Sequence, residues 1–437
     1  MERTYTAQAG SKPGEKVRLM GFLQTARRQS KIQFLILRDV TGTIQCVVSK
    51  EHEAVFAAAE DISLESVIVV EGVAVAAPQA PGGAEIQVES VEVLSAAAPE
   101  LPIPVVEKGE GETDQSLRLD YRWLDLRKPK NLLIFQVWTT FEEAFMKYFL
   151  EKGFLEIHSP KFMSAPSESG AELFTVDYFG GKAYLAQSPQ FYKQMAMASG
   201  FEKVFEVGPV FRAEPSFTTR HATEFTGYDF EMSFIDSHED IAANLEGMIA
   251  SVLTTIKERH GEKIKELFGR ELVVPTLPFP RVTLAEAKEL LKPFDIKSDK
   301  VGDLNPEEEK KLSEVIMEKH GHEFVFVTEY PIESRAFYHM RYEDRPGITR
   351  GFDLMWNGVE ITTGAQREHR YEVLKKQALD KGLTEASIGT YLDFFKYGCP
   401  PHGGAGIGPV RMMMKMFNTE NIREVTYLHR GVNRLTP

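Results

Sequence analysis

Short runs in which apolar and polar residues alternate fill positions 16 to 94, and they constrain the fold more than any other feature. The runs are VRLMGFL, IQFLILRD, TIQCVVS, SVIVVEGVAV and EIQVESVEVL, and turn signals such as VTGT and APGGA separate them. A period of two turns one face of each strand toward a core. Roughly five short strands in so few residues predict a small barrel, and the oligonucleotide/oligosaccharide-binding (OB) barrel is one such fold.

The pattern changes after a proline-rich stretch, SAAAPELPIPV, which predicts a linker at residues 95–105. Apolar residues then follow a helical spacing in LLIFQVWTTFEEAFMKYFLEKGF, and the longest helix is predicted at residues 241–268. Strand-like runs such as KVFEVGPVF and TGYDFEMSFI alternate with helical ones, with neither an internal repeat nor a βαβ rhythm. This part is therefore predicted to be α+β with an antiparallel sheet.

Composition limits the possible classes of protein. The 437 residues suffice for two or three domains, and the formal net charge is −13, so local basic patches must bind any nucleic-acid partner. Cys46 and Cys399 are the only cysteines and give neither metal-ligand spacing nor a disulfide framework. The polar start lacks the apolar core of a signal peptide, and no apolar run reaches the roughly eighteen residues of a membrane span. We expect a soluble, cytoplasmic protein with no membrane partner.

The stretch FRAEPSFTTRHATEF concentrates charge and aromatic surface between two strand-like runs. Arg212 and Glu214, two apart at the end of the first run, are expected to point to one face. An arginine for a phosphate, Phe225 to stack on a base, and a loop pair Arg220/His221 for further phosphate would suit a nucleoside triphosphate. A solvated charged hairpin is the alternative, although three phenylalanines are of little use in water.

Two further stretches could bind anions or metal. A glycine-rich turn, GGAGIG, is predicted to lead into a helix with Pro409 and Arg411 in its first turn, where an anion is favoured, although a simple tight turn is equally consistent. Asp353 and Glu360 flank an NG turn, so a hairpin would bring two carboxylates together as Mg²⁺ ligands. A surface hairpin without a metal remains the alternative.

Together these stretches resemble the class II aminoacyl-tRNA synthetases over nearly the whole chain. EKGFLEIHSPKF, with Pro160, is similar to the first motif, which forms the dimer interface in the family; FRAEPSFTTRHATEF is similar to the second and GGAGIGPVRM to the third. QSPQFYKQ, RHATEFTGYDFEM and TTGAQR look like the aspartyl branch in its compact archaeal-type form. The resemblance implies an OB-fold anticodon-binding domain at 1–104, a hinge at 105–130, a class II catalytic domain at 131–437, and a homodimer.

The resemblance also implies the reaction and its nucleotide site. An aspartate carboxylate attacks the α-phosphorus of ATP, pyrophosphate leaves, and a ribose hydroxyl of tRNA then attacks the adenylate. Arg212 would bridge the two reacting groups and, with Arg411, act in catalysis; Asp353 and Glu360 would hold Mg²⁺. The residues assigned to ATP are Arg212, Glu214, Arg220, His221, Phe225, Glu360 and Arg411. Neither step needs a protein nucleophile, since positioning and charge neutralisation suffice.

The residues that the resemblance assigns to aspartate are Glu168, Gln190, Lys193, Asp229 and Arg367. A buried substrate carboxylate needs paired cations, and Arg367 can grip it bidentately while Lys193 adds a point charge. The amide of asparagine would leave that lysine facing an NH₂ group, which such sites reject. Glu168 and Asp229 would hold the α-ammonium or orient Lys193. Aspartate is therefore the predicted amino acid.

The anticodon residues implied by the resemblance are Gln24, Arg27, Phe34, Gln45 and Pro81. Phe34 and Gln45 match positions that stack on and hydrogen-bond the central anticodon uridine, and the loop TARRQSK supplies charge for phosphates. A core role for Phe34 is the alternative.

This sequence departs from the family at several positions. Gln24 and Pro81 stand where strictly aspartate-specific relatives tend to carry tryptophan and lysine, so we hypothesise charging of both tRNA(Asp) and tRNA(Asn), with an amidotransferase completing the asparagine product. The third motif has GPVR in place of GLER, and YLHRGVNRLTP replaces FPRDxxRLTP, but Arg411 is kept and an active enzyme is expected. The alternatives are a strictly tRNA(Asp)-specific enzyme, a paralogue that forms aspartyl-adenylate without tRNA, and a catalytically silent RNA-binding protein.

Overall fold

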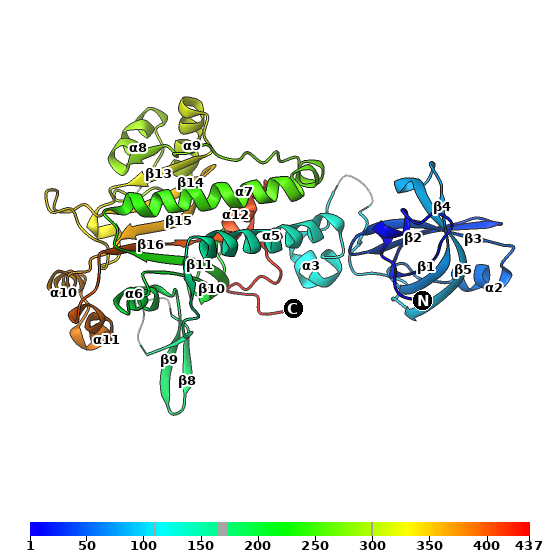
Figure 1. Cartoon of the computed structure of the whole chain (residues 1–437), viewed down its shortest axis with the longest axis horizontal. Helices are drawn as coiled ribbons and strands as arrows, with labels where there is room; N and C mark the ends of the chain where they lie inside the picture. Colours follow the sequence, from blue (N-terminus) through cyan, green and yellow to red (C-terminus); the bar gives the residue numbers. More distant parts are fainter. Residues whose placement is uncertain (108–110, 165–172, 299) are drawn as a thin grey trace. The chain divides into compact units, whose positions relative to one another are not determined.

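The computed structural model describes residues 1–107, 111–164, 173–298 and 300–437. The chain divides into two compact units, residues 1–132 with Pro437, and residues 133–436 (Figure 1). The boundaries of the three predicted domains stay a prediction. Within the described ranges, no helix is long and apolar enough to cross a membrane.

The first unit contains a closed five-stranded barrel in the order β1-β2-β3-β5-β4. Its strands are β1 (Lys16–Arg28), β2 (Ile32–Asp39), β3 (Gly42–Ser49), β4 (Val67–Ala76) and β5 (Ala84–Ser95). The five predicted runs each fall within or overlap one strand, so the sequence prediction of a barrel is confirmed. Residues at alternate positions, such as Leu19, Leu35 and Val48, fill its core, because period-two alternation selects one face of every strand.

Short helices complete this unit. They are α1 (Thr6–Ala9), α2 (Glu53–Glu60), the 3₁₀ turn η1 (Pro81–Gly83), α3 (Gln115–Asp120) and α4 (Arg122–Asp125). Residues 96–107 and 111–114 contain no helix or strand. The predicted linker at 95–105 is therefore confirmed except at Ser95, which ends β5.

The second unit is built on an eight-stranded sheet in the order β12-β13-β14-β15-β16-β11-β10-β6. Its strands are β6 (Leu155–Glu156), β10 (Lys203–Phe211), β11 (Glu224–Ser233), β12 (Arg281–Thr283), β13 (Phe324–Thr328), β14 (Gly351–Trp356), β15 (Val359–Gln366) and β16 (His402–Ile407). Neighbours pair antiparallel except at the two edges, β12 with β13 and β6 with β10. The predicted α+β class is therefore confirmed.

Two long helices, α5 (Pro129–Glu151) and α7 (His238–Phe268), lie side by side along the sheet (Figure 1). The ion pair between Arg259 and Glu143 and the hydrogen bond from the Tyr148 hydroxyl to the Asn244 carbonyl join them. Aromatic rings from α5 pack on those of β10 and β11, as in the stacked pair Phe149 and Phe205, with centroids 5.6 Å apart. These contacts form the largest core cluster of the protein.

The remaining elements surround the sheet. The helices are α6 (Gln190–Ala198), α8 (Leu284–Leu291), α9 (Pro306–His320), α10 (Tyr371–Asp380), α11 (Glu385–Lys396), α12 (Pro409–Met416) and α13 (Ile422–Val425), with 3₁₀ turns η2 (Lys292–Phe294) and η3 (Ile332–Ser334). A small sheet, in the order β7-β9-β8, consists of β7 (Phe162–Met163), β8 (Thr175–Tyr178) and β9 (Gly181–Leu185).

Two local predictions need correction. GGAGIG was predicted to be a turn, but it forms strand β16 in the middle of the sheet. The glycines are needed there because a Cβ on Gly404 would lie 2.1 Å from the Phe230 carbonyl oxygen and 2.2 Å from Glu231 Oε2. In addition, Arg212 and Glu214 lie beyond the end of β10 and not within a strand.

Candidate active site

A cavity of about 310 Å³ opens in the second unit, over strands β10, β11, β15 and β16 and the start of α12. The predicted ATP and aspartate residues that line it are Gln190, Arg212, Glu214, Arg220, His221, Phe225, Asp229, Glu360, Arg367 and Arg411. Residues as far apart in sequence as Gln190 and Arg411 thus meet at one site. Lys193 and Asp353 are not on its wall, and Glu168 lies outside the described residues.

The hairpin of β10 and β11 forms one wall of the cavity. Val210 pairs with Phe225 and Phe211 with Glu224, and the Arg212 amide continues the ladder by donating to the Thr223 carbonyl at 2.9 Å. The Arg212 guanidinium carbon lies 5.5 Å from the centroid of the Phe225 ring. An aromatic ring and a cation at this separation can contact a base and an adjacent phosphate of one nucleotide.

Three arginines, Arg212, Arg220 and Arg411, gather around His221. Burial first, and then the positive charge of Arg411, lower the pKa of His221, while Glu214 acts against them. The imidazole is therefore neutral at neutral pH and adds hydrogen-bonding capacity without a fourth positive charge. This end of the cavity is suited to a polyanion such as a triphosphate.

Arg411 is fixed by the neighbouring strand. Its Nη1 donates to the Glu360 carbonyl oxygen at 2.9 Å and lies 3.5 Å from the Glu360 carboxylate. The helix α12 that carries it begins at Pro409, and the Gly408 amide before it donates to the Ile361 carbonyl at 2.8 Å. The predicted helix and its first-turn arginine are therefore present at the cavity.

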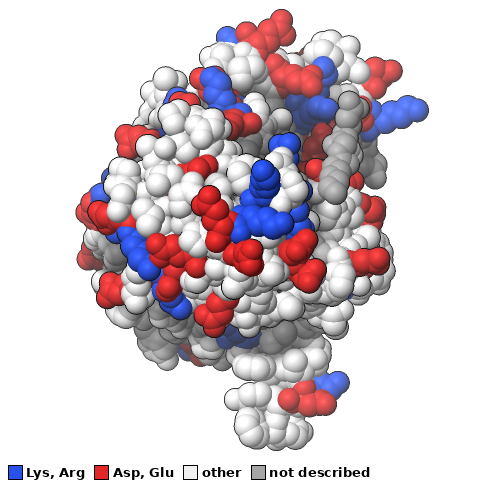
Figure 2. All heavy atoms as spheres, turned by 90° about the vertical axis from the view of Figure 1, so that its right-hand side faces the viewer, with Lys and Arg blue, Asp and Glu red and all other residues white. Residues whose placement is uncertain are grey.

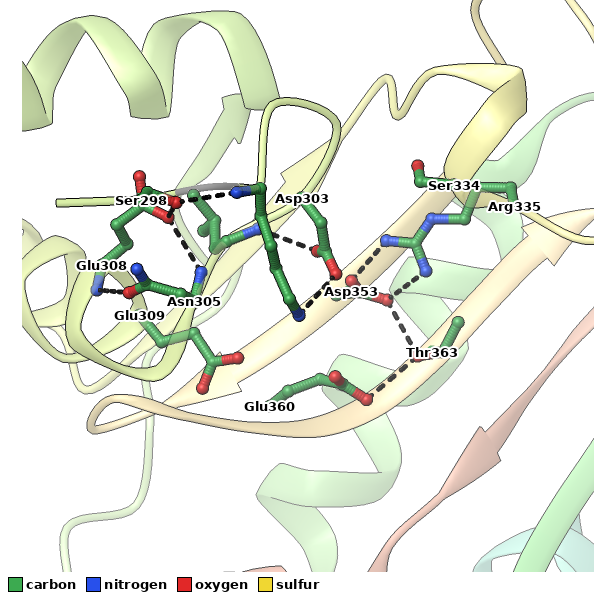
Figure 3. Close-up of polar contacts among 12 residues, drawn as sticks. Ser298, Asp303, Asn305, Glu308, Glu309, Ser334, Arg335, Asp353, Glu360 and Thr363 are labelled. Atoms are coloured by element: carbon green, nitrogen blue, oxygen red, sulfur yellow. Dashed lines mark hydrogen bonds and ion pairs between the residues drawn. The ribbon is translucent and has the colours of Figure 1, made fainter. Parts of the chain in front are cut away.

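The β14–β15 hairpin brings the two predicted metal ligands near each other, as expected. The Thr363 hydroxyl oxygen lies 2.8 Å from Asp353 Oδ1 and 3.1 Å from Glu360 Oε1 (Figure 3). Asp353 is only 2% exposed, and the Arg335 guanidinium binds both of its oxygens. Glu360, in contrast, lines the cavity. Direct coordination by Asp353 would require Arg335 to move away.

The fit of these donors to Mg²⁺ depends on their number and kind. No group of three or more His, Cys, Asp or Glu side chains that could hold a metal by itself occurs in the described ranges. Mg²⁺ needs only one or two protein carboxylates when phosphate oxygens and water complete its octahedron. The Glu360 carboxylate therefore fits a metal that arrives with the nucleotide.

A buried network of charges lies at the other end of the cavity. Lys193 Nζ donates to Asp229 Oδ1 at 2.9 Å and to the Ala405 carbonyl at 3.3 Å, and it lies 3.3 Å from Glu231 Oε2. Arg367 donates from Nε to Glu231 Oε1 at 2.9 Å and from Nη2 to the Gly404 carbonyl at 3.0 Å. Burial alone would raise the pKa of Glu231, but Arg367 and Lys193 together hold it below its usual value.

Glu231 was not identified from the sequence. It is fully buried and joins the two cations that were predicted to bind the substrate. The signal was present in GYDFEM, where Asp229 and Glu231 occupy alternate positions of β11 and therefore face the same side. A second missed residue, Gln194, accepts from Gln190 Nε2 and from the Tyr391 hydroxyl, each at 2.9 Å, and so fixes Gln190.

The predicted anticodon residues lie in the barrel. Phe34 is half-buried and pairs with Arg27 across β1 and β2, while its neighbours Gln33 and Leu35 are buried. Phe34 therefore faces away from the barrel core, which removes the alternative of a core role. Gln45 shares this outer face, since it pairs with Ile36, two positions from Phe34. The Gln45 amide donates to Glu85 Oε2 at 2.9 Å.

Gln24 occupies an irregularity between Leu23 and Thr25 in β1. Its Oε1 accepts from Arg38 Nη1 at 3.3 Å, and Arg38 is itself paired with the buried Glu65 at 2.6 Å. Pro81 is exposed at the start of η1. On the face drawn in Figure 2, Lys and Arg side chains form several small groups among Asp and Glu side chains, as expected when a chain of net negative charge offers only local basic surface.

Family models match most of the chain. Residues 114–430 match the family model of class II tRNA synthetases (D, K and N), and residues 17–94 match an OB-fold nucleic-acid-binding domain. The chain is 43% identical to "Aspartate--tRNA(Asp/Asn) ligase" of Aeropyrum pernix, over 97% of this chain and 96% of the relative. It is 41% identical to "Aspartate--tRNA(Asp) ligase" of Pyrococcus abyssi, over 97% of each chain.

Solved structures are similar over the whole chain. Asparaginyl-tRNA synthetase of Pyrococcus horikoshii, complexed with asparaginyl-adenylate, has a TM-score of 0.93 and 34% identity, covering 100% of both chains. Aspartyl-tRNA synthetase of Entamoeba histolytica has a TM-score of 0.90 and 31% identity, covering 100% of this chain and 93% of that one.

Proposed function

The chain belongs to the class II tRNA synthetases of the D, K and N group, and from this premise we propose how its site works as an aspartate–tRNA ligase. The enzyme attaches L-aspartate to tRNA with ATP, through an aspartyl-adenylate. The single observation that carries the proposal is the cavity in which Arg212, Phe225 and Arg411 meet Arg367. One end of that cavity is suited to a nucleotide and the other to a small acid.

In the proposed first step, the aspartate carboxylate attacks the α-phosphorus and pyrophosphate leaves. Arg212 would contact both reacting groups, Phe225 would stack on adenine, and Arg220 and Arg411 would bind the outer phosphates. Mg²⁺ bound with the nucleotide at Glu360 would supply charge neutralisation on the phosphate oxygens. The gain from these groups is positioning and electrostatic stabilisation, since no side chain needs to form a covalent bond.

Selection of aspartate over asparagine is proposed to depend on Arg367. Two of its nitrogens are engaged by Glu231 and Gly404, and no partner for Nη1 is found among the described residues. Lys193 donates to Asp229, which lines the cavity, but Lys193 itself is not part of the cavity wall. Its positive charge adds to that of Arg367 at this end of the site. The side-chain carboxylate of aspartate can accept from Arg367, whereas asparagine offers one acceptor and an NH₂ group that would face a cation.

We also propose that the enzyme charges both tRNA(Asp) and tRNA(Asn), with an amidotransferase acting on the second product. Gln24 and Pro81 motivate this proposal, because a small amide held by Arg38 leaves more space than a tryptophan at the third anticodon base. The relatives include both Asp/Asn and Asp-only ligases at similar identity, so identity alone does not decide between the alternatives. A homodimer is proposed from the similarity of residues 151–162 to the first motif. A cytoplasmic location is proposed because the two free, widely separated cysteines suit a reducing compartment.

The test is charging of two purified transcripts, with anticodons GUC and GUU, by labelled aspartate. Comparable rates on both are expected. Charging of GUC alone would refute dual specificity and leave the aspartate ligase intact. Amino-acid selection is tested separately by pyrophosphate exchange, where aspartate should support the reaction and asparagine should not.

A further inference from the structure

Arg220, on the loop between β10 and β11, is held by a helix from a distant part of the chain. Its Nη1 donates to Glu309 Oε2 at 2.9 Å, and its Nη2 lies 3.4 Å from the Gly358 carbonyl oxygen. The two side chains are 26% and 12% exposed, so the pair is largely shielded from water. Arg220 also lines the cavity, so a side chain of the cavity wall is held by partners on α9 and on the β14–β15 hairpin.

Hydrogen bonds restrain the first turn of α9, which carries Glu309. Asn305 caps the helix by accepting from the amides of Glu307 and Glu308 at 3.0 and 2.9 Å, and the Glu308 carboxylate accepts from the Asn305 amide at 2.8 Å. Lys288 and Ser298 also donate to Glu308, at 2.7 and 2.8 Å. A capping box with two further donors restrains the first turn, from which Glu309 projects.

Helix α9 is also locked onto the β14–β15 hairpin. Gly358 has a φ of +77°, and a Cβ there would lie 2.7 Å from the Lys310 Cα. The Gly358 amide donates to the Ser313 hydroxyl oxygen at 2.8 Å. Helix and hairpin are therefore in close contact, and the Glu309 carboxylate and the Gly358 carbonyl oxygen both accept from Arg220.

The surroundings of Glu309 are otherwise unfavourable for a carboxylate. Burial first, and then the neighbouring Glu360, raise the pKa of Glu309 to about 7, while Arg220 and Arg411 oppose this shift. Figure 3 shows the two carboxylates in the same region, from α9 and β15 respectively. The role of Glu309 is therefore argued from geometry: Arg220 is the hydrogen-bonded partner of this largely buried carboxylate, at 2.9 Å.

We propose that Glu309 is a positioning residue for ATP: it holds Arg220 by one edge so that the remaining N–H groups face the outer phosphates. The proposal rests on the proposed function of the cavity. It extends the ATP site to the segment of α8 and α9, which none of the predicted motifs includes. Without Glu309 the loop arginine would lose its preset orientation, and ATP binding would have to order it.

The test is pyrophosphate exchange by the full-length protein, with KM for ATP, KM for aspartate and kcat measured separately. Glu309→Ala should raise KM for ATP about tenfold and leave KM for aspartate unchanged. Glu309→Gln, which keeps an acceptor oxygen, should give a smaller increase. Glu307→Ala removes an exposed acid of the same helical turn and should behave as the parent enzyme.

A double-mutant comparison separates positioning from a general structural effect. In an Arg220→Ala background, Glu309→Ala should add nothing to KM for ATP, because the residue it orients is gone. An unchanged or lowered KM for ATP in Glu309→Ala, or full additivity with Arg220→Ala, would overturn the proposal. If Glu309→Ala does not fold, the same cycle with Glu309→Gln decides by the same criterion.

Failure of the proposed ligase function would give a different result from failure of the Glu309 proposal. A parent enzyme that exchanges no pyrophosphate with any amino acid would refute ligase activity. Direct titration of ATP into the parent and variant proteins would then measure the Arg220 effect independently, with the same expected tenfold loss and the same lack of additivity.

Discussion

Replacing Glu231 by glutamine should lower both the free energy of unfolding of the protein and its affinity for aspartate. The carboxylate is fully buried and bound by Arg367 at 2.9 and 3.4 Å and by Lys193 at 3.3 Å. Glutamine keeps one acceptor oxygen but turns an NH₂ donor toward Arg367 or Lys193. Removing one charge of a buried pair costs about 3 kcal/mol. For a unit of this size, that corresponds to a fall of about 5 °C in the thermal midpoint.

The assay is thermal and urea unfolding of the full chain, together with KM for aspartate in pyrophosphate exchange. Glu266→Gln, at an exposed position of α7, is the control and should leave both readings unchanged. KM for aspartate should rise in Glu231→Gln, because Arg367 loses the partner that orients it. A free energy of unfolding within about 0.5 kcal/mol of the parent would refute the argument, since that is the effect of an ordinary surface change.

The Glu231 carboxylate also makes the stability of the protein depend on pH, in a direction that follows from its pKa shift. Its folded-state pKa lies below the ordinary glutamate value of about 4.3. Its stabilisation is therefore complete above that value and is lost as the pH falls through the folded-state pKa. The difference in unfolding free energy between parent and Glu231→Gln should be constant between about pH 6 and 8 and should shrink below about pH 4. A difference that grows on acidification would contradict this assignment.

Three further changes address the nucleotide and the tRNA. Phe225→Leu should raise the Kd for ATP about tenfold, because stacking on a base is worth about 1–3 kcal/mol, and isothermal titration with ATP measures it. Arg212→Ala should lower kcat for adenylate formation by about 10²–10³ with a smaller change in KM for ATP, as measured in single turnovers. Gln24→Trp should lower charging of the GUU transcript at least about tenfold while GUC charging and pyrophosphate exchange persist; equal losses on both transcripts would count against a role in discrimination.

Much of the fold could be predicted because local patterns specify it. Alternation between residues 16 and 94 located the barrel strands, and helical periodicity located α5 and α7. The β14–β15 hairpin followed from its NG turn, where Asn357 and Gly358 both adopt positive φ. These features depend on neighbours in sequence, so a single sequence contains them.

The missed features depend on long-range packing. The glycines of β16 resembled a turn because nothing local indicates that a buried Glu231 occupies the space beside Gly404. Glu231 itself looked like an ordinary position in an alternating strand. Glu309 lies 89 positions from Arg220, in a segment that no motif marked. Partners at such separations are specified by topology and not by spacing.

Strand β16 has a consequence for the order of events during synthesis. It pairs on one side with β15 and on the other with β11, and thereby joins the earlier and later parts of the sheet. The same strand is followed at once by Arg411, and both lie near the end of the chain. Domains fold from the N-terminus as they emerge. The barrel can therefore be complete while the sheet under the ligand cavity still lacks the strand between β15 and β11. The nascent chain therefore acquires a nucleotide site only after β16 has been made.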